Sequence, residues 1–284
     1  APAVTLVKPG DSVLVGQKIA EAQGFISACI ISSVSGTVKA IEPRLTTTGA
    51  MAESIIIEND NEYKKIAGFG VERDYTKLSK DEIRTNIKNA GIVGMGGAAF
   101  PTHVKLTPKD ENGITHVIVN AAECEPYLTS DYRIMLEEPA NLITGLKIIL
   151  SLFDNAKGVI AIENNKPDCI ETLDKLLTPE DKNKICVMPL KAKYPQGAER
   201  NLIYAVTGKK INSKMLPADA GVIVNNVDTV ISVKNAVCNN IPLIRRIITV
   251  TGDAVVNPQN FCVPTGMCYQ ELIDAAGGFK STPE

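Results

Sequence analysis

The sequence predicts an α/β protein made of three regions, and three observations lead to that prediction. Short β-branched runs separated by turn residues fill the first 61 residues. Helical and strand-like patterns then alternate from about residue 74 to residue 240. After residue 241, one more strand and one short helix are expected. A chain of 284 residues is long enough for two or three domains of this kind.

The first region predicts a small β-sandwich or barrel. Several short runs rich in Val, Ile and Thr have the length and composition of strands. Turn signals such as Pro9-Gly10-Asp11 and Ser35-Gly36 separate these runs. The expected strands span residues 4–7, 13–15, 26–31, 37–41 and 54–57.

The alternating pattern of the second region predicts a largely parallel sheet that is covered by helices on both faces. The region opens on a helix with Asp81, Glu82 and Arg84 on its solvent-facing side. The expected strands span residues 116–120, 158–163, 184–189 and 221–224. Further helices are expected over residues 140–152 and from residues 167 and 198 onward.

The last region predicts a small α+β unit. Residues 246–251 have the pattern of a strand, and residues 269–276 that of a helix capped by Gly277-Gly278. The sequence opens with Ala-Pro-Ala-Val in strand-like material and stops at Pro283-Glu284, just after this helix. We therefore expect the chain to be an excised piece of a longer one.

The composition argues against several kinds of partner and ligand. With 30 Lys and Arg against 32 Asp and Glu, no polybasic field attracts nucleic acid or anionic lipid. Because no apolar run approaches the ~18 residues that span a bilayer, direct membrane insertion is not expected. The seven cysteines include no CxxC pair, so the sequence predicts no metal site in this chain and reduced thiols in a cytosolic protein.

A glycine-rich loop carries the densest chemical signal. Gly94, Gly96 and Ala99 satisfy the dinucleotide-binding pattern G-x-G-x-x-G/A. That pattern requires a strand before it and a helix after it, whereas here the preceding segment, 80–90, is helical, so the ordinary Rossmann interpretation is rejected. Small residues still expose backbone N–H groups to a flat ring or a phosphate. A tight helix–loop connection is the alternative.

Three further loops follow strands or precede helices. Residues 120–126 place an amide and two carboxylates at a strand end, where open α/β sheets bind ligands. Residues 224–229 repeat this arrangement, and residues 194–199 form a Pro/Gly loop before a helix. A solvated acidic turn and a helix cap remain the alternatives for the first two loops taken singly. Four such loops in one domain favour a binding site.

These four motifs resemble those of a known family. The runs GMGGAAFPTHVK at 94–105, VNAAECEP at 119–126, YPQGAE at 194–199 and VNNVDT at 224–229 are similar to the flavin and NADH site of the 51-kDa-type subunit of respiratory complex I. The resemblance is closer to the C subunits of Rnf-type ferredoxin:NAD oxidoreductases, and it covers nearly the whole chain.

The resemblance implies three modules. Residues 1–66 would form a barrel-sandwich hybrid like that of biotinyl and lipoyl carriers, unmodified because the turn at 32–36 has no lysine. Residues 67–240 would form a Rossmann-like FMN- and NADH-binding domain. Residues 241–284 would form a β-grasp module of the soluble-ligand-binding (SLBB) type, cut before a C-terminal iron–sulfur segment.

The resemblance also implies the site residues. FMN would contact Gly94, Gly96, Gly97, Ala98, Lys105, Asn120, Glu123, Asn225, Asn226 and Thr229. NADH would contact Phe100, Lys105, Glu125, Tyr194 and Glu199. No side chain is assigned a catalytic role, because hydride passes between the two cofactors. The sequence departs from the complex I pattern at Met95, Ala99, Ala122 and Ala198, which affects NADH contacts more than flavin binding.

The implied function is that of a flavin-containing, NADH-binding electron-transfer subunit of an ion-translocating ferredoxin:NAD oxidoreductase. Its partners would be the other subunits of a membrane-bound Rnf-type complex, at the cytoplasmic face of the cell membrane, where it would be peripheral. 4Fe-4S clusters are expected only in the segment beyond residue 284. The alternatives are an electron-transfer flavoprotein of a cobalamin- or proline-reductase system, and a non-enzymatic adaptor.

Overall fold

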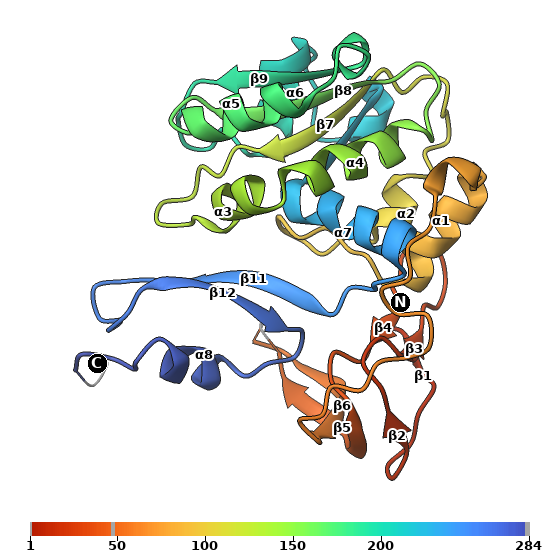
Figure 1. Cartoon of the computed structure of the whole chain (residues 1–284), viewed down its shortest axis with the longest axis vertical. Coiled ribbons are helices and arrows are strands. Elements are labelled where there is room, and N and C mark those ends of the chain that lie inside the picture. Colours follow the sequence, from red (N-terminus) through yellow and green to blue (C-terminus); the bar gives the residue numbers. More distant parts are fainter. Residues whose placement is uncertain (1, 47–48, 282–284) are drawn as a thin grey trace.

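Strands in the chain form four separate sheets among the residues that the structure describes, 2–46 and 49–281. In this computed structural model, two small antiparallel sheets come first, a four-stranded parallel sheet follows, and a two-stranded antiparallel sheet comes last. Figure 1 shows the last sheet running below helices of the parallel-sheet domain, with the N-terminal sheets beside both. The chain is therefore organised as the sequence predicts.

The N-terminal sheets enclose a small apolar core of Val13, Ile19 and Val38. Four of the strands lie where they were predicted, although the expected strand at 26–31 is limited to its last two residues. The strand at 18–21 was not predicted, because its Lys and Glu ends hide a short buried core. One sheet has the order β1 (Val4–Thr5), β3 (Lys18–Glu21), β4 (Ile30–Ile31); the other has the order β2 (Ser12–Val13), β5 (Gly36–Leu45), β6 (Met51–Asn59).

The central sheet is parallel throughout, which confirms the prediction made from the alternating pattern. Along β7, Val117 and Val119 pack into the larger core and Ile118 into the smaller one, because successive side chains point to opposite faces. Both faces are covered, so the strands are nearly uniformly apolar. The order is β10 (Val222–Asn226), β7 (His116–Ala121), β8 (Lys157–Glu163), β9 (Ile185–Leu190).

The helices divide unequally between the two faces. The larger core joins one face of the sheet to α1 (Lys80–Asn89), α3 (Ser130–Glu137), α4 (Pro139–Leu150), α5 (Pro167–Leu176) and α7 (Val227–Asn239). The smaller core joins the other face to α6 (Glu199–Thr207). Two short helices, α2 (Thr102–Lys105) and α3, were not predicted from the sequence.

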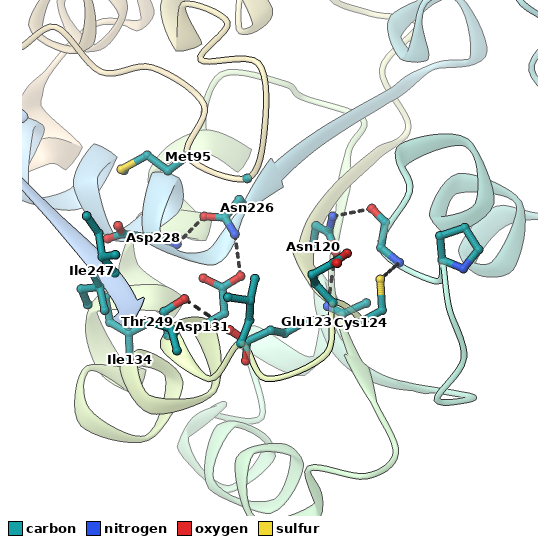
Figure 2. A pocket seen from close by; sticks show the side chains of 18 of the residues that line it. Met95, Asn120, Glu123, Cys124, Asp131, Ile134, Asn226, Asp228, Ile247 and Thr249 are labelled. Atoms are coloured by element: carbon teal, nitrogen blue, oxygen red, sulfur yellow. Dashed lines mark hydrogen bonds between the residues drawn. The ribbon is translucent and has the colours of Figure 1, made fainter. Parts of the chain in front are cut away.

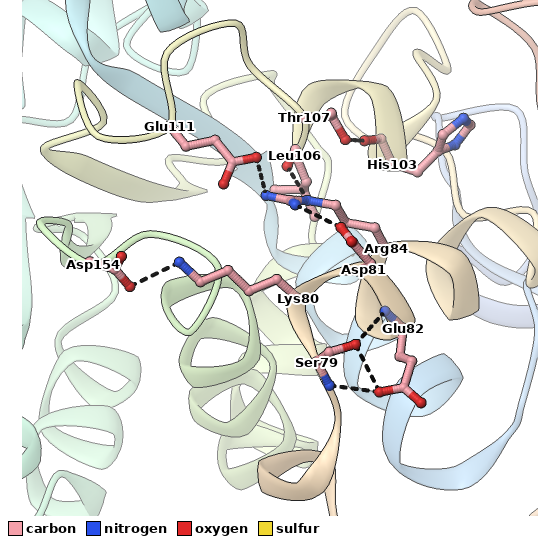
Figure 3. Close-up of polar contacts among 10 residues, drawn as sticks. All are labelled: Ser79, Lys80, Asp81, Glu82, Arg84, His103, Leu106, Thr107, Glu111 and Asp154. Carbon is pink, nitrogen blue, oxygen red and sulfur yellow. Dashed lines mark hydrogen bonds and ion pairs between the residues drawn. The ribbon is translucent and has the colours of Figure 1, made fainter.

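Helix α1 begins at a capping box, and the prediction that its residue Arg84 faces solvent is wrong. The Ser79 hydroxyl accepts from the Glu82 amide at 3.2 Å, and the Glu82 carboxylate accepts from the Ser79 amide at 2.8 Å (Figure 3). Arg84, expected to face solvent, is largely covered: its Nε donates to the Leu106 carbonyl at 3.0 Å, and it pairs with Glu111 at 2.7 Å. A long side chain can bury its stem while the guanidinium finds partners across a loop.

The C-terminal module packs against the central domain through its first strand. Strand β11 (Arg245–Val250) pairs antiparallel with β12 (Gln259–Pro264), and α8 (Tyr269–Ala275) follows. Strand β12 was not predicted. Arg245 pairs with Glu138 at 3.3 Å, just before α4, so this module is tied to the α/β domain by an ion pair. Among the described residues, no helix is long and apolar enough to cross a bilayer.

Gly145 provides a test of the packing between α4 and α7. A Cβ placed on this residue would lie 2.2 Å from the Val230 carbonyl oxygen, so the two helix backbones must separate to accommodate any side chain. We expect Gly145→Ala to lower the free energy of unfolding by roughly 2 kcal/mol or more, measured by urea denaturation. The matched control is Ala140→Ser on the exposed side of α4, which should cost about 0.5 kcal/mol or less. Equal losses would contradict close helix contact at Gly145.

Candidate functional site

A cavity of about 520 Å³ lies where the carboxyl ends of the parallel strands meet β11. Its walls come from the glycine loop, the loop after β7, the loop before α6, the first turns of α3 and α7, and one stretch of β11 (Figure 2). Cavities that hold cofactors and small ligands have volumes of about 300 to 1,000 Å³. The cavity is therefore the candidate site.

The residues predicted to bind FMN or NADH divide into two groups around this cavity. Those that line it are Gly96, Asn120, Glu123, Glu125, Tyr194 and Asn226. Those that do not line it are Gly94, Gly97, Ala98, Phe100, Lys105, Glu199, Asn225 and Thr229. Several residues of the second group support the cavity indirectly, because they hold the segments that line it in place.

The glycine loop is held by contacts from two other elements. The Met95 amide donates to the Thr229 hydroxyl of α7 at 2.9 Å, and the Met95 carbonyl accepts from Arg246 of β11 at 2.8 Å. Gly96 lies against Asn226, since a Cβ on Gly96 would come within 3.0 Å of the Asn226 Cβ. The loop therefore presents bare backbone to the cavity because a side chain at Gly96 would collide with its neighbour.

Asn226 both caps α7 and faces the cavity. Its Oδ1 accepts from the amides of Asp228 at 2.9 Å and Thr229 at 3.4 Å, as the capping alternative predicted. Its Nδ2 donates to Asp131 Oδ2 at 2.7 Å. The parallel register places Asn226 opposite Asn120 of β7. One side chain thus joins three walls of the site.

The loops at 120–126 and 194–199 are joined directly. Asn120 Nδ2 donates to the Gly197 carbonyl at 2.9 Å, and the Gly197 amide donates to Cys124 Sγ at 3.3 Å (Figure 2). The Tyr194–Pro195 peptide bond is cis, and the Tyr194 side chain is 68% exposed at the mouth of the cavity. These contacts bring together two motifs more than 70 residues apart in the chain.

Glu123 is satisfied by the start of α3. Its carboxylate accepts from the amides of Asp131 at 2.8 Å and Tyr132 at 3.1 Å, and from the Ser130 hydroxyl at 3.3 Å. A carboxylate at a helix N-terminus is favoured both by the free N–H groups and by the helix dipole. This carboxylate therefore anchors α3 to the strand end while it lines the cavity.

Lys105 lies behind the cavity wall. Its Nζ donates to the Val224 carbonyl of β10 at 2.8 Å and lies 3.9 Å from Glu199 Oε1. Burial lowers the pKa of Lys105, which the nearby Glu199 carboxylate partly opposes. The ammonium is therefore fixed at the end of β10.

Two charged residues of the cavity, Asp131 and Arg246, were missed by the sequence analysis. A third, Asp228, lies in the predicted motif at 224–229 but was not predicted as a site residue. Burial, followed by repulsion from Glu123, raises the pKa of Asp131 to about 7, and burial also raises the pKa of Asp228. Arg246 is the one Lys or Arg among the described residues that line the cavity. The Ser130-Asp131 pair has the composition of a helix start, and this pattern could have predicted that Asp131 lies in the first turn of a helix.

Comparison with known protein families shows which family the chain belongs to. Residues 87–235, more than half of the chain, match the profile of the Nuo51 FMN-binding domain. The chain belongs to this family. Residues 1–62 match the RnfC barrel sandwich hybrid domain, and residues 247–284 match the SLBB domain, which confirms the predicted three-part fold class. The predicted domain boundaries at 66 and 240 fall between the matched ranges and remain predictions.

Curated relatives extend the similarity over the whole chain, which confirms the resemblance to the C subunits of Rnf complexes. The chain is 42% identical to the C subunit of the Na(+)-translocating ferredoxin:NAD(+) oxidoreductase complex of Acetobacterium woodii, covering 100% of this chain and 63% of the relative. It is 42% identical to the proton-translocating counterpart of Clostridium ljungdahlii, covering 100% and 61%. The chain therefore spans less than two thirds of the length of these two relatives.

Solved structures support the fold of this Nuo51-family chain. An NAD+-reducing nickel–iron hydrogenase in its H2-reduced state superposes with a TM-score of 0.59 at 21% identity, covering 70% of this chain and 39% of that one. At this identity the likeness shows the fold alone. It agrees with the parallel sheet and its covering helices.

Glu123 gives a test of how the site is built. We expect Glu123→Ala to lower the free energy of unfolding by about 1 to 3 kcal/mol, because three donors at the start of α3 lose their acceptor. The measurement is chemical denaturation of the whole chain. The control is Glu125→Ala, whose exposed side chain makes no hydrogen bond or ion pair with other described residues and should change stability by about 0.5 kcal/mol or less. A smaller effect at Glu123 than at Glu125 would contradict the anchoring role.

Proposed function

We propose that this chain binds one FMN non-covalently in the cavity and exchanges hydride between that flavin and NAD(H). It would do so as an electron-transfer subunit of an ion-translocating ferredoxin:NAD oxidoreductase. The observation that carries the proposal is that residues of four separated motifs, all within or beside a matched FMN-binding domain, line or support a single cavity. The names of the relatives supply the reaction and the complex.

The cavity fits a flavin in size and in the chemistry of its walls. Asp228 Oδ1 is buried without a hydrogen-bond donor among the described residues, so a polar atom is available to a ligand. Met95, Ile134 and Ile247 give the lining apolar surface, which suits a flat ring system. The bare backbone at Gly96 allows close approach. The polar side chains of the lining converge on the cavity from the strand ends, from α3 and α7, and from β11.

FMN, when bound, would supply the hydride chemistry, so the protein needs no nucleophile and no general base of its own. The side chains of Asn120 and Asn226 would orient the cofactor with donors and acceptors that are already held by hydrogen bonds. Glu125 and Tyr194, at the mouth, would face the nicotinamide nucleotide. Strand β11 would exclude water from the side opposite the sheet.

The partners and location are part of the same proposal. The chain would assemble with other subunits of a membrane-bound Rnf-type complex as a peripheral subunit at the cytoplasmic face. Among the described residues, no group of three His, Cys, Asp or Glu side chains could hold a metal ion. The 4Fe-4S clusters predicted beyond residue 284 stay a prediction. A non-enzymatic adaptor would bind no flavin, so flavin retention separates the two functions.

Lys105 tests FMN binding. Equilibrium dialysis at micromolar concentrations of chain and FMN should show one FMN retained, and Lys105→Ala should weaken binding by about tenfold or more. The Lys105 ammonium lies behind the cavity wall on the Val224 carbonyl, and its remaining N–H bonds would make a charge-assisted contact with the FMN phosphate, which contributes about 1.5 to 3 kcal/mol. The matched control is Lys209→Ala, which removes an ammonium that donates to the Ala220 carbonyl at 2.7 Å, before the other end of β10. Equal weakening by both variants would mean that Lys105 acts only by supporting the strand. No FMN retention by the folded wild type would contradict the proposed function.

Glu125 tests the nucleotide side of the site. Glu125→Gln keeps the shape and removes the charge, so FMN should remain bound while NADH-driven bleaching of the flavin slows. The measurement is stopped-flow absorbance over a range of NADH concentrations. The control is Glu137→Gln on the exposed side of α3, where Glu137 pairs with Arg133 and with no other described residue. Bleaching at the wild-type rate in Glu125→Gln would show that this carboxylate has no part in NADH contact.

A further inference from the structure

Three acidic residues from three elements converge on the cavity. Glu123 lies after β7, Asp131 in the first turn of α3, and Asp228 in the first turn of α7 (Figure 2). Glu125 lines the mouth, and Arg246 of β11 is the cation that faces the group. A cavity with four carboxylates and one guanidinium should resist an anionic ligand unless some of the negative charge is removed.

The hydrogen bonds distinguish Asp131 from Glu123. Both Glu123 oxygens accept from donors of α3, the role of an ionised carboxylate. The Asp131 carboxylate has one hydrogen bond, from Asn226 to its Oδ2, and no ion-pair partner within the described part of the chain. The Arg246 guanidinium is engaged with the Met95 carbonyl. Asp131 therefore has an oxygen available to carry a proton toward the cavity.

Asp228 provides independent evidence that the cavity receives a polar ligand. The residue is 6% exposed, it lines the cavity, and its Oδ1 has no hydrogen-bond donor among the described residues. The nearest cationic nitrogen, on Arg245, is 3.9 Å away. A buried carboxylate oxygen without a donor is costly unless a ligand or water supplies one. Asp228 Oδ1 therefore needs a hydrogen-bond donor from a molecule bound in the cavity.

We propose that Asp131 is a proton-holding positioning residue, and that an anionic cofactor enters this cavity together with one proton taken from solvent onto the Asp131 carboxylate. This inference rests on the proposed function, since FMN supplies the anion. The neutral carboxylic acid donates a hydrogen bond into the cavity and accepts the one from Asn226. The proton comes from solvent, and no bond of the cofactor is made or broken.

The direction of the linkage follows from the charges that face Asp131. Burial, followed by repulsion from Glu123 and Asp228, already favours the neutral form of Asp131, while the Asn226 amide and Arg246 oppose it. A bound phosphate adds about 1.5 to 2 negative charges and favours the neutral form further. Above about pH 7 the ligand-free chain has lost this proton, so binding must recover it and affinity falls as pH rises. Below that pH the proton is already present and little uptake occurs.

The test is calorimetric titration of FMN into the whole chain at about pH 8 in two buffers of different ionisation enthalpy. We expect nearly one proton taken up per FMN by the wild type, and close to zero by Asp131→Asn, which mimics the neutral acid. Because the phosphate itself titrates near pH 6, the decisive quantity is the difference between the two proteins. Glu137→Gln, exposed on the same helix, should match the wild type.

A second measurement does not depend on the variant folding. Infrared difference spectra of the wild type should show a carboxylic-acid carbonyl band that appears when FMN binds at about pH 8. Riboflavin, which lacks the phosphate, should produce a much weaker band. FMN binding without this band, or equal proton uptake by wild type and Asp131→Asn, would overturn the inference and leave the proposed function intact. Absence of FMN binding at every pH would instead overturn the proposed function.

Discussion

The parallel register between β7 and β10 sets Asn120 opposite Asn226, and this pairing decides where the cavity forms. Both strands end at the same edge of the sheet, so the two motifs that follow them meet although they lie about 100 residues apart. Asn226 then caps α7 and reaches Asp131 at the start of α3. A shift of the register by one residue would reverse the faces of the side chains and separate the two asparagines.

The C-terminal module completes the site. Strand β11 contributes Arg246, Ile247 and Thr249 to the cavity, and Arg246 also fixes the glycine loop through the Met95 carbonyl. Thr249 and Asn260 form a polar cluster with Thr129, just before α3. Without β11, the cavity would be an open cleft at the sheet edge. The FMN-binding domain and the SLBB module therefore share one site, and displacement of β11 would change both the loop and the charge of the cavity.

Local patterns in the sequence were sufficient for most of the elements, because periodicity and turn chemistry act over a few residues. Strands β3 and β12 and helices α2 and α3 were not predicted. The parallel sheet, the four loops and the helix cap at Asn226 follow from such patterns. The exposure of Arg84 was predicted wrongly, since two of its partners, the Leu106 carbonyl and the Glu111 carboxylate, lie more than 20 residues further along the chain. Asp131 and Arg246 were missed for a similar reason: each enters the cavity through a tertiary contact, from an unpredicted helix and from another module. The charge balance of a site is a property of the assembled fold.

Backbone carbonyls hold the two cations near the cavity in place. Lys105 donates to the Val224 carbonyl, and Arg246 donates to the Met95 carbonyl. Each contact uses a fraction of the available donors, since an ammonium has three N–H bonds and a guanidinium five. A backbone carbonyl holds a cation in place without neutralising its charge, whereas a carboxylate neutralises it; of these two cations, Lys105 also has a carboxylate nearby, with Glu199 Oε1 at 3.9 Å. The cost of ordering these long side chains is therefore met when the chain folds, which leaves less entropy to lose when a phosphate-bearing ligand binds.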